Sequence, residues 1–339
     1  MSTDTRSRTS DPGAARRAVA GGSVGGFRRR PWAFALILTV LLMLGNVLLQ
    51  PAFLDPGHWP GLLGTLAPFV LVALASTPPI LGGGGGIDIS VGPLATFVNC
   101  VFVVVLIPAG LGSFATALPI LLLIGVVAGL VNGLLVVVAR LQPVIATLTT
   151  FFVLSGLALK LSSVPTTAPD NWTRDLAGSV GFVPGGLLTM GAAAALWLAL
   201  RRTPYVRTLY AVGGDDVAAF SAGVAVARVR VGVYVLSGVL ATLAGIALTA
   251  VIQSSESSLA TTYTLIALAG VSLGGTSFAG GRGGLLGSFL GACSIFLLQE
   301  LLSASGASTN YVQFVYGLLL VVGVVLSGLL ARSRSETSQ

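Results

Sequence analysis

The chain has 339 residues, of which 54% are hydrophobic and 9% are charged; its net charge is +7 and its mean hydropathy is +0.95. These values lie far outside the range of soluble domains, so the expected main solvent is a lipid bilayer. The two cysteines, Cys100 and Cys293, lie in apolar runs, and the single histidine, His58, lies in a loop. The sequence therefore offers no disulfide framework, metal site or catalytic triad, and a self-contained enzyme is not expected.

Residues 1–30 are rich in arginine, glycine, serine and alanine and show no apolar periodicity, which predicts a disordered tail. The run Arg28–Arg30 before an apolar stretch resembles the start of a signal sequence. The apolar stretch from Trp32 to Leu49 is, however, long for a signal core, and no small-residue cleavage site follows it. We therefore expect a retained first helix.

About 20 apolar residues are needed to cross the hydrocarbon core, and on this basis the sequence predicts an all-α, polytopic bundle of ten spans. The spans are 32–50, 61–81, 93–108, 116–139, 142–161, 184–200, 231–252, 263–275, 284–303 and 311–331. The third and eighth are short and adjoin the glycine runs Gly82–Gly86 and Gly274–Gly275. Broken or re-entrant elements lining a cavity are expected near 82–93 and 263–283, because irregular backbone is tolerated at membrane depth only there.

The distribution of cations supports this layout and sets its orientation. With ten spans, most of the 18 lysines and arginines fall on the side where the chain begins. They are Arg6, Arg8, Arg16, Arg17, Arg28, Arg29, Arg30, Arg140, Arg201, Arg202, Arg207, Arg228, Arg230, Arg282, Arg332 and Arg334. Only Lys160 and Arg174 fall on the other side. The positive-inside rule then predicts a transmembrane domain over 31–331, with cytoplasmic tails at 1–30 and 332–339, and gives no reason to invoke nucleic acid.

Two loops are long enough to carry structure, an external one at 162–183 and a cytoplasmic one at 201–230. In the cytoplasmic loop, Asp215 is expected to cap a short helix that Gly223 ends. A small, largely apolar helix in this place suits either a docking element for a soluble partner or a plain interfacial helix.

Four segments resemble one known family. They are Thr203–Gly223, Leu81-Gly-Gly-Gly-Gly-Gly-Ile-Asp-Ile-Ser-Val-Gly92, Gln142-Pro-Val-Ile-Ala-Thr-Leu148 and Leu273-Gly-Gly-Thr-Ser-Phe-Ala-Gly-Gly-Arg-Gly-Gly-Leu-Leu-Gly-Ser288. In order and spacing they are similar to ABC transporter permeases of the ribose/xylose/autoinducer-2 type, within the branched-chain amino acid/ribose permease superfamily. The long glycine run before Ile87, Pro93 and the Asp215-Asp216 pair depart from the family pattern.

The resemblance implies an importer subunit in the bacterial inner membrane that translocates a sugar or sugar-like solute. It implies cytoplasmic ABC ATPase subunits that use ATP and Mg, a second permease subunit, identical or related, and an external solute-binding protein, with no cofactor on this chain. It assigns coupling to the ATPase to Gly213, Gly214, Asp215, Asp216, Ala218, Ala219 and Gly223. It assigns the signature and pore geometry to Gly86, Asp88, Ser90, Gly92, Gly274, Gly275, Gly280 and Gly281.

Polar side chains within the spans are few. Asp88 is expected either to cap the third span or to contact solute or a proton. Buried amides either join helices or face water; the candidates for the solute path are Asn46, Asn132 and Gln253, and the others are Gln50, Asn99 and Gln299. An ion-coupled secondary transporter is the alternative function, but it needs a charged relay within the membrane, and apart from Asp88 the spans offer almost none.

Overall fold

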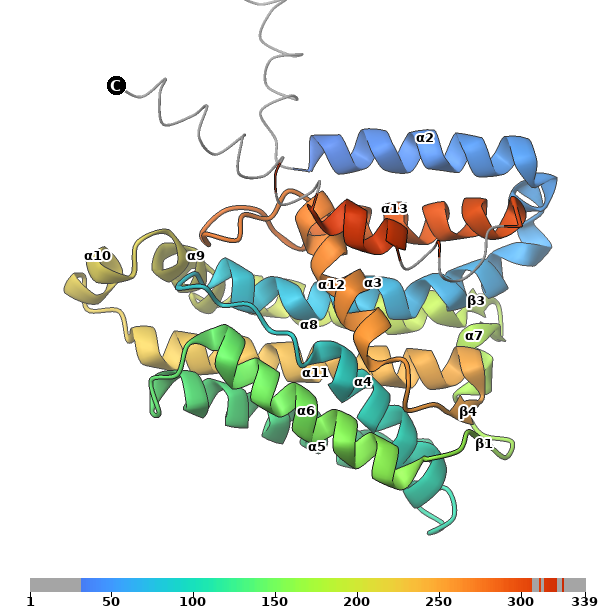
Figure 1. The fold of residues 1–339 in the computed structure, drawn as a ribbon, viewed down its shortest axis with the longest axis horizontal. Coiled ribbons are helices and arrows are strands. Elements are labelled where there is room, and N and C mark those ends of the chain that lie inside the picture. Colours follow the sequence, from blue (N-terminus) through green and yellow to red (C-terminus); the bar gives the residue numbers. More distant parts are fainter. Residues whose placement is uncertain (1–31, 307–310, 312–313, 322–324, 326–339) are drawn as a thin grey trace, which may run out of the picture.

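The computed structural model describes residues 32–306, 311, 314–321 and 325. Its longer helices are α2 (Ala33–Leu49), α3 (Trp59–Leu81), α4 (Val91–Cys100), α5 (Phe114–Val137), α6 (Pro143–Leu161), α8 (Gly185–Arg201), α9 (Tyr205–Gly214), α11 (Val226–Ile252), α12 (Ala260–Leu273) and α13 (Leu285–Ala304). Most of them run side by side along the long axis of the molecule, while α4 and α12 cross it obliquely (Figure 1). A π-helix, η3 (Val101–Leu106), continues α4. The shorter elements are η1 (Pro51–Leu54), η2 (Pro56–His58), α7 (Arg174–Ala177), α10 (Asp216–Ser221), β1 (Thr166–Thr167), β2 (Ser179–Val180), β3 (Val183–Pro184) and β4 (Ser254–Ser255).

The first nine predicted spans are all helical. Five helical stretches are long and apolar enough to cross a membrane, and they contain α3, α5, α6, α11 and α13. Four shorter apolar stretches correspond to α2, α4 with η3, α8 and α12. The expected polytopic helical bundle is confirmed. The predicted tail 1–30, the tail 332–339 and much of the tenth span, 311–331, lie outside the described residues.

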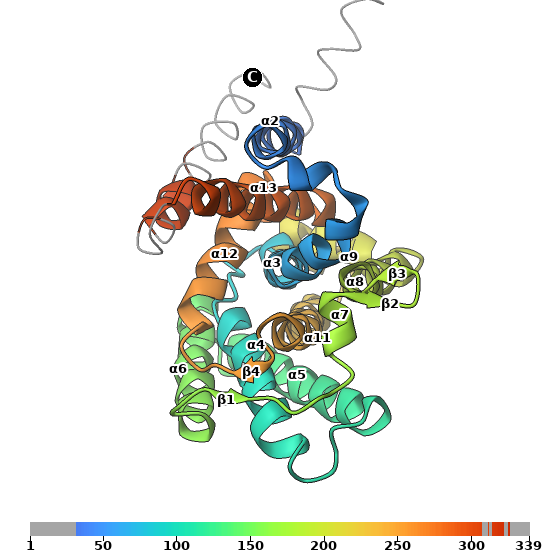
Figure 2. The same cartoon turned by 90° about the vertical axis from the view of Figure 1, so that its right-hand side faces the viewer.

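Helices α3 and α11 form the centre of the bundle (Figure 2). In the most apolar window of each span, 67% of the residues are buried for the span that contains α3 and 72% for α11. The corresponding share is 28% for both α5 and α6. In a bilayer, an exposed apolar face can contact lipid, so α5 and α6 present the faces expected of peripheral spans. Both cysteines are buried and unpaired, as expected of small core residues.

The two predicted irregular elements are observed, one as a non-helical segment and the other as a short helix. The backbone from Gly82 to Ser90 is not helical, and α4 starts at Val91. Helix α12 has 14 residues, about 21 Å of rise, which is less than the roughly 30 Å hydrocarbon core. The two elements touch: the Thr264 hydroxyl donates to the Ile89 carbonyl at 3.2 Å, and a Cβ on Gly92 would lie 2.6 Å from the Thr264 nitrogen.

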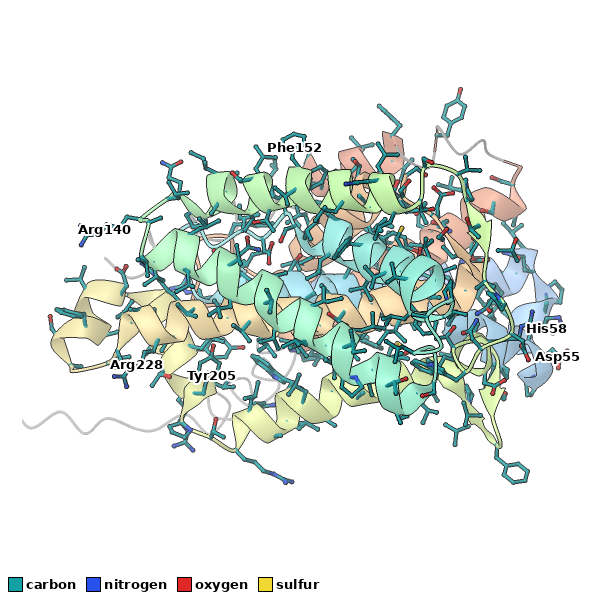
Figure 3. The ribbon with its side chains drawn as sticks, turned by 90° about the horizontal axis from the view of Figure 1, so that it is seen from below. Asp55, His58, Arg140, Phe152, Tyr205 and Arg228 are labelled. Carbon is teal, nitrogen blue, oxygen red and sulfur yellow. The ribbon has the colours of Figure 1, made fainter. Side chains whose placement is uncertain are left out.

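Charged residues separate the two ends of the bundle. Arg140 and Arg228 lie toward one end of the bundle, as does Tyr205, while Asp55 and His58 lie at the opposite end (Figure 3). We call the first the arginine-rich end; α9 and α10 lie there, and the β1–β4 pair lies at the opposite end (Figure 1).

Candidate functional site

The loop between α8 and α11 folds into two short helices, α9 and α10. The Asp215 carboxylate accepts a hydrogen bond from the Ala218 backbone N–H at 2.9 Å, so it caps α10 as the sequence predicted. Gly223 takes φ +83°, and its N–H donates to the Phe220 carbonyl at 2.9 Å. The Val224 N–H donates to the Ala219 carbonyl at 3.0 Å, which completes a Schellman motif. Both ends of α10 are therefore fixed by local hydrogen bonds.

Helix α10 exposes two large apolar side chains, one of which, Phe220, also lines a cavity described below. Val217 is 73% exposed and Phe220 is 72% exposed, while Ala219 between them is 6% exposed and faces inward. Residues three apart lie on one face of a helix, so Val217 and Phe220 form a single projection. Of the other predicted coupling residues, Gly214 is open, since nothing lies within 4 Å of a Cβ placed there.

Gly213 joins this loop to two other segments. A Cβ on Gly213 would lie 2.7 Å from the Gly281 nitrogen and closer still to the Leu81 carbonyl oxygen, to which the Gly281 N–H donates at 3.0 Å. A Cβ on Gly280 would lie 2.6 Å from the Gly213 carbonyl oxygen, and Gly83 is equally confined. We call Gly83, Gly213, Gly280 and Gly281 the glycine junction. There the end of α3, the end of α9 and the loop before α13 meet backbone to backbone.

An ion pair makes a second connection between α10 and the bundle. The Arg230 guanidinium, on α11, donates to the Asp216 carboxylate at 2.6 Å. Its terminal nitrogen also lies 2.6 Å from where a Cβ on Gly84 would be. Because the Asp216 side chain is 45% exposed, solvent weakens the attraction, and the pair contributes more to positioning than to stability.

A cavity of about 480 Å³ lies beside this ion pair at the arginine-rich end. Its walls come from the Gly82–Gly86 run, the turn between α5 and α6, α10 and the first turns of α11. Tyr234 also lines it, and its hydroxyl has no hydrogen-bond partner among the described residues. The predicted association of the glycine run with a cavity is thus observed.

Asp88 is the centre of a buried polar network. Its carboxylate accepts hydrogen bonds from the Ser90 backbone N–H at 2.9 Å, from the Ser90 hydroxyl at 2.6 Å and from the Ser237 hydroxyl at 2.7 Å. The Asn132 amide donates to the Ser90 hydroxyl at 2.8 Å, and the Thr150 hydroxyl donates to the Asn132 carbonyl at 2.5 Å. The carboxylate thus bonds to the residue before α4 rather than to the first-turn donors of α4, and it ties the broken segment to α11, α5 and α6.

Other signature glycines allow close packing. A Cβ on Gly274 would lie 2.6 Å from the Ser288 nitrogen at the start of α13, and a Cβ on Gly86 would lie 2.9 Å from the Gly83 carbonyl oxygen. Gly275 takes φ +73° in the turn that ends α12. Side chains at Gly86 and Gly274 would push the broken segments apart, so these residues set the geometry of the bundle interior.

The three residues named for the solute path are not brought together. The Asn46 amide donates to the Leu42 and Leu297 carbonyls at 2.9 and 2.8 Å and joins α2 to α13. Gln253 ends α11 and accepts from the Asn171 amide at 3.2 Å, and Asn132 belongs to the Asp88 network. Of the remaining amides, Asn99 bonds to Thr249 and to the Ser254 carbonyl, Gln50 donates to the Glu300 carbonyl, and Gln299 accepts from the Tyr316 hydroxyl. The amides join helices, and a solute role for the three remains a prediction.

Several residues that form these sites gave no signal in the sequence. Ser237 lies 149 residues from Asp88, and Arg230 lies 14 residues from Asp216 across a loop. Tyr234 is an ordinary aromatic in an apolar helix. These pairings depend on how α11 is rotated against α3 and α10, which apolar periodicity does not specify.

An apolar helical bundle with several helices long enough to span a bilayer defines a multi-pass membrane protein. The chain belongs to the family described as branched-chain amino acid transport system / permease component, whose model matches residues 61–324. It is therefore a permease subunit, a transport component without an ATPase site of its own.

Curated relatives cover most of the chain. It is 35% identical to the ribose import permease protein RbsC of Bacillus subtilis over 299 residues, which is 85% of this chain and 90% of that protein. It is 33% identical to the fructose import permease protein FruG of Bifidobacterium longum, over 87% of this chain and 90% of that protein. It is 32% identical to the probable ABC transporter permease protein YphD of Escherichia coli, over 90% of this chain and 91% of that protein. No solved structure matches.

Proposed function

We propose that this chain is the membrane-spanning permease subunit of an ATP-driven importer for a sugar or a sugar-like solute. The relatives named for ribose and fructose import support the solute class, because the similarity covers at least 85% of this chain in both cases. The solute path would run through the bundle, and the energy would come from a separate ATPase.

The exposed apolar projection on α10 is the observation that carries this proposal. Val217 and Phe220 lie on a helix whose ends are fixed by Asp215 and Gly223, at the end of the bundle rich in arginine. Two large apolar side chains exposed together on a capped helix suit contact with a protein partner. A groove on a cytoplasmic ATPase subunit is the partner that would bury them.

The glycine junction supplies the mechanical link. Because Gly213 packs backbone to backbone against Leu81 and Gly281, no flexible side chain separates α9 from α3 or from the loop before α13. When the ATPase binds ATP and Mg and pulls α10, the displacement passes to these segments and from them to the broken helices. The Asp88 network connects the same broken segment to α11, so the interior moves with it.

The orientation follows from charge. The arginine-rich end faces the cytoplasm by the positive-inside rule, with both termini there, and the end that holds Asp55 and the 162–183 loop faces outward. An external solute-binding protein would deliver solute at that outer end. A second permease subunit, identical or related, would complete the pore.

The ion-coupled alternative would place the driving force on this chain alone. Its strongest support is Asp88, a buried carboxylate near the middle of the bundle. The hydrogen bonds from Ser90 and Ser237 occupy both carboxylate oxygens, however, which suits a structural role better than repeated protonation.

A pair of substitutions tests the docking role of α10. Val217→Ser combined with Phe220→Ser should abolish co-purification of the ATPase while leaving the isolated permease folded, since both side chains are exposed. Phe182→Ser is the matched control, because Phe182 is fully exposed in the turn between β2 and β3 at the opposite end. Equal ATPase recovery with the double variant and the control would contradict the assignment of α10.

A further inference from the structure

A second cavity lies at the arginine-rich end, apart from α10. Its volume is about 640 Å³, and it is formed where four elements begin or end. Trp32 at the start of α2, Trp197 and Arg201 at the end of α8, Arg207 on α9 and Leu285 at the start of α13 line it. None of these residues belongs to the α10 projection or to the Asp88 network.

The cavity carries uncompensated positive charge. Arg201 and Arg207 are exposed, and among the described residues neither has an ion pair, while no aspartate or glutamate lines the cavity. Burial raises the pKa of the Tyr210 hydroxyl, and the nearby Arg201 charge opposes that rise. Tyr210 therefore stays a neutral donor, bonded to the Gly283 carbonyl at 3.0 Å. An anion would meet two guanidinium groups and no competing carboxylate.

The N-terminus of α13 adds to the positive electrostatic potential of the cavity. This helix of 20 residues begins at Leu285 after Gly284 and has no capping side chain. Leu285, Leu286 and Gly287, the residues of its first turn, all line the cavity. The first N–H groups of an uncapped helix and the positive end of its dipole favour negative charge. The arginines and the helix start therefore act in the same direction.

The position of the cavity along the spanning helices favours a membrane lipid as its ligand. It lies where α2 and α13 start and α8 ends, which for spanning helices is the level of lipid headgroups. Trp32 and Trp197 fit the tryptophan enrichment of that level. Leu286, beside the arginines, is 57% exposed and offers apolar surface next to the charged site. A molecule with an anionic head and an apolar tail matches both surfaces.

We infer that this cavity binds the phosphodiester headgroup of an anionic phospholipid, with Arg201 and Arg207 on the phosphate and the acyl chains along the adjoining apolar surface. The inference rests on the orientation proposed above, since it requires the leaflet at the arginine-rich end. Bound lipid would hold α9 against the start of α13. Because Gly213 lies in the last turn of α9, the lipid would stabilise the glycine junction and favour coupling.

The experiment measures lipid binding to the purified full chain in detergent by native mass spectrometry and by the shift in thermal unfolding. The probes are phosphatidylglycerol, phosphatidylcholine of the same chain length, and inorganic phosphate. Arg201→Gln combined with Arg207→Gln should weaken phosphatidylglycerol binding by about 25-fold, since each arginine near an anionic headgroup contributes about fivefold. Arg201→Lys combined with Arg207→Lys should retain most of the binding.

Arg140→Gln combined with Arg228→Gln is the matched control, because it removes the same charge from the same end but from outside this cavity (Figure 3). It should change phosphatidylglycerol binding less than twofold. The inference is overturned if both glutamine pairs weaken binding equally, if phosphatidylcholine binds as well as phosphatidylglycerol, or if inorganic phosphate stabilises the chain as much as the lipid does. ATPase co-purification should be unchanged in lipid-free detergent, so failure here is distinguishable from failure of the α10 assignment.

Discussion

Gly213→Ala places one methyl group in the glycine junction. Its Cβ would lie 2.7 Å from the Gly281 nitrogen, where ordinary contact begins at 3.4 Å, so that neighbour must retreat by about 0.7 Å, and the Leu81 carbonyl by more. Overpacking a tight interior costs about 1–3 kcal/mol. Strain on the bond from the Gly281 N–H to the Leu81 carbonyl adds about 1 kcal/mol. We expect the variant to be about 2–4 kcal/mol less stable and to hydrolyse ATP without coupled uptake.

The neighbouring glycine provides the control for this prediction. Gly214→Ala adds the same methyl group where nothing lies within 4 Å, and alanine favours a helix over glycine by up to about 1 kcal/mol. Thermal unfolding in detergent and ATP-dependent uptake in proteoliposomes would be measured for both variants. Gly214 is itself assigned to coupling, so it serves as the control for stability: if Gly213→Ala were as stable as Gly214→Ala, the junction would not be the rigid link described above.

Three further experiments probe the remaining contacts. Asp88→Asn exchanges an acceptor of three hydrogen bonds for a group that also donates, and should lower stability by about 1–3 kcal/mol in thermal unfolding; an unchanged midpoint would argue against the network. A double-mutant cycle with Asp216→Asn and Arg230→Gln should give a coupling energy below about 1 kcal/mol that falls with added salt, because the pair is partly exposed; a larger, salt-insensitive value would contradict this. Asp215→Ala should cost about 1 kcal/mol of local stability, seen as faster amide exchange over 216–221 with the global midpoint unchanged.

The predictable part of the molecule is local in sequence. Hydrophobic length alone located nine helices, and Asp215 and Gly223 were recognisable as the ends of α10 because capping depends on residues two to four positions away. The glycine runs likewise indicated broken backbone at Gly82–Gly86. Boundaries were less accurate: α11 starts at Val226 rather than at 231, since Arg228 and Arg230 continue the helix into the polar end.

The unpredictable part depends on helix rotation and register. Whether Asn132 faces solute or Ser90 is decided by the angle of α5 about its axis, and an apolar helix with no polar stripe does not reveal it. The pairing of Asp88 with Ser237 requires the broken segment to lie against the middle of α11. Gly213 and Gly281 were expected for their family pattern, but their contact with one another is visible only once α9 is packed.

Uptake of radiolabelled ribose and fructose into proteoliposomes tests the central claim most directly. Vesicles would hold this chain alone under an imposed proton gradient, or this chain with its ATPase, binding protein and internal ATP. We predict uptake only in the second case, and its loss when Val217 and Phe220 are both replaced by serine. Gradient-driven uptake by the chain alone would contradict the account.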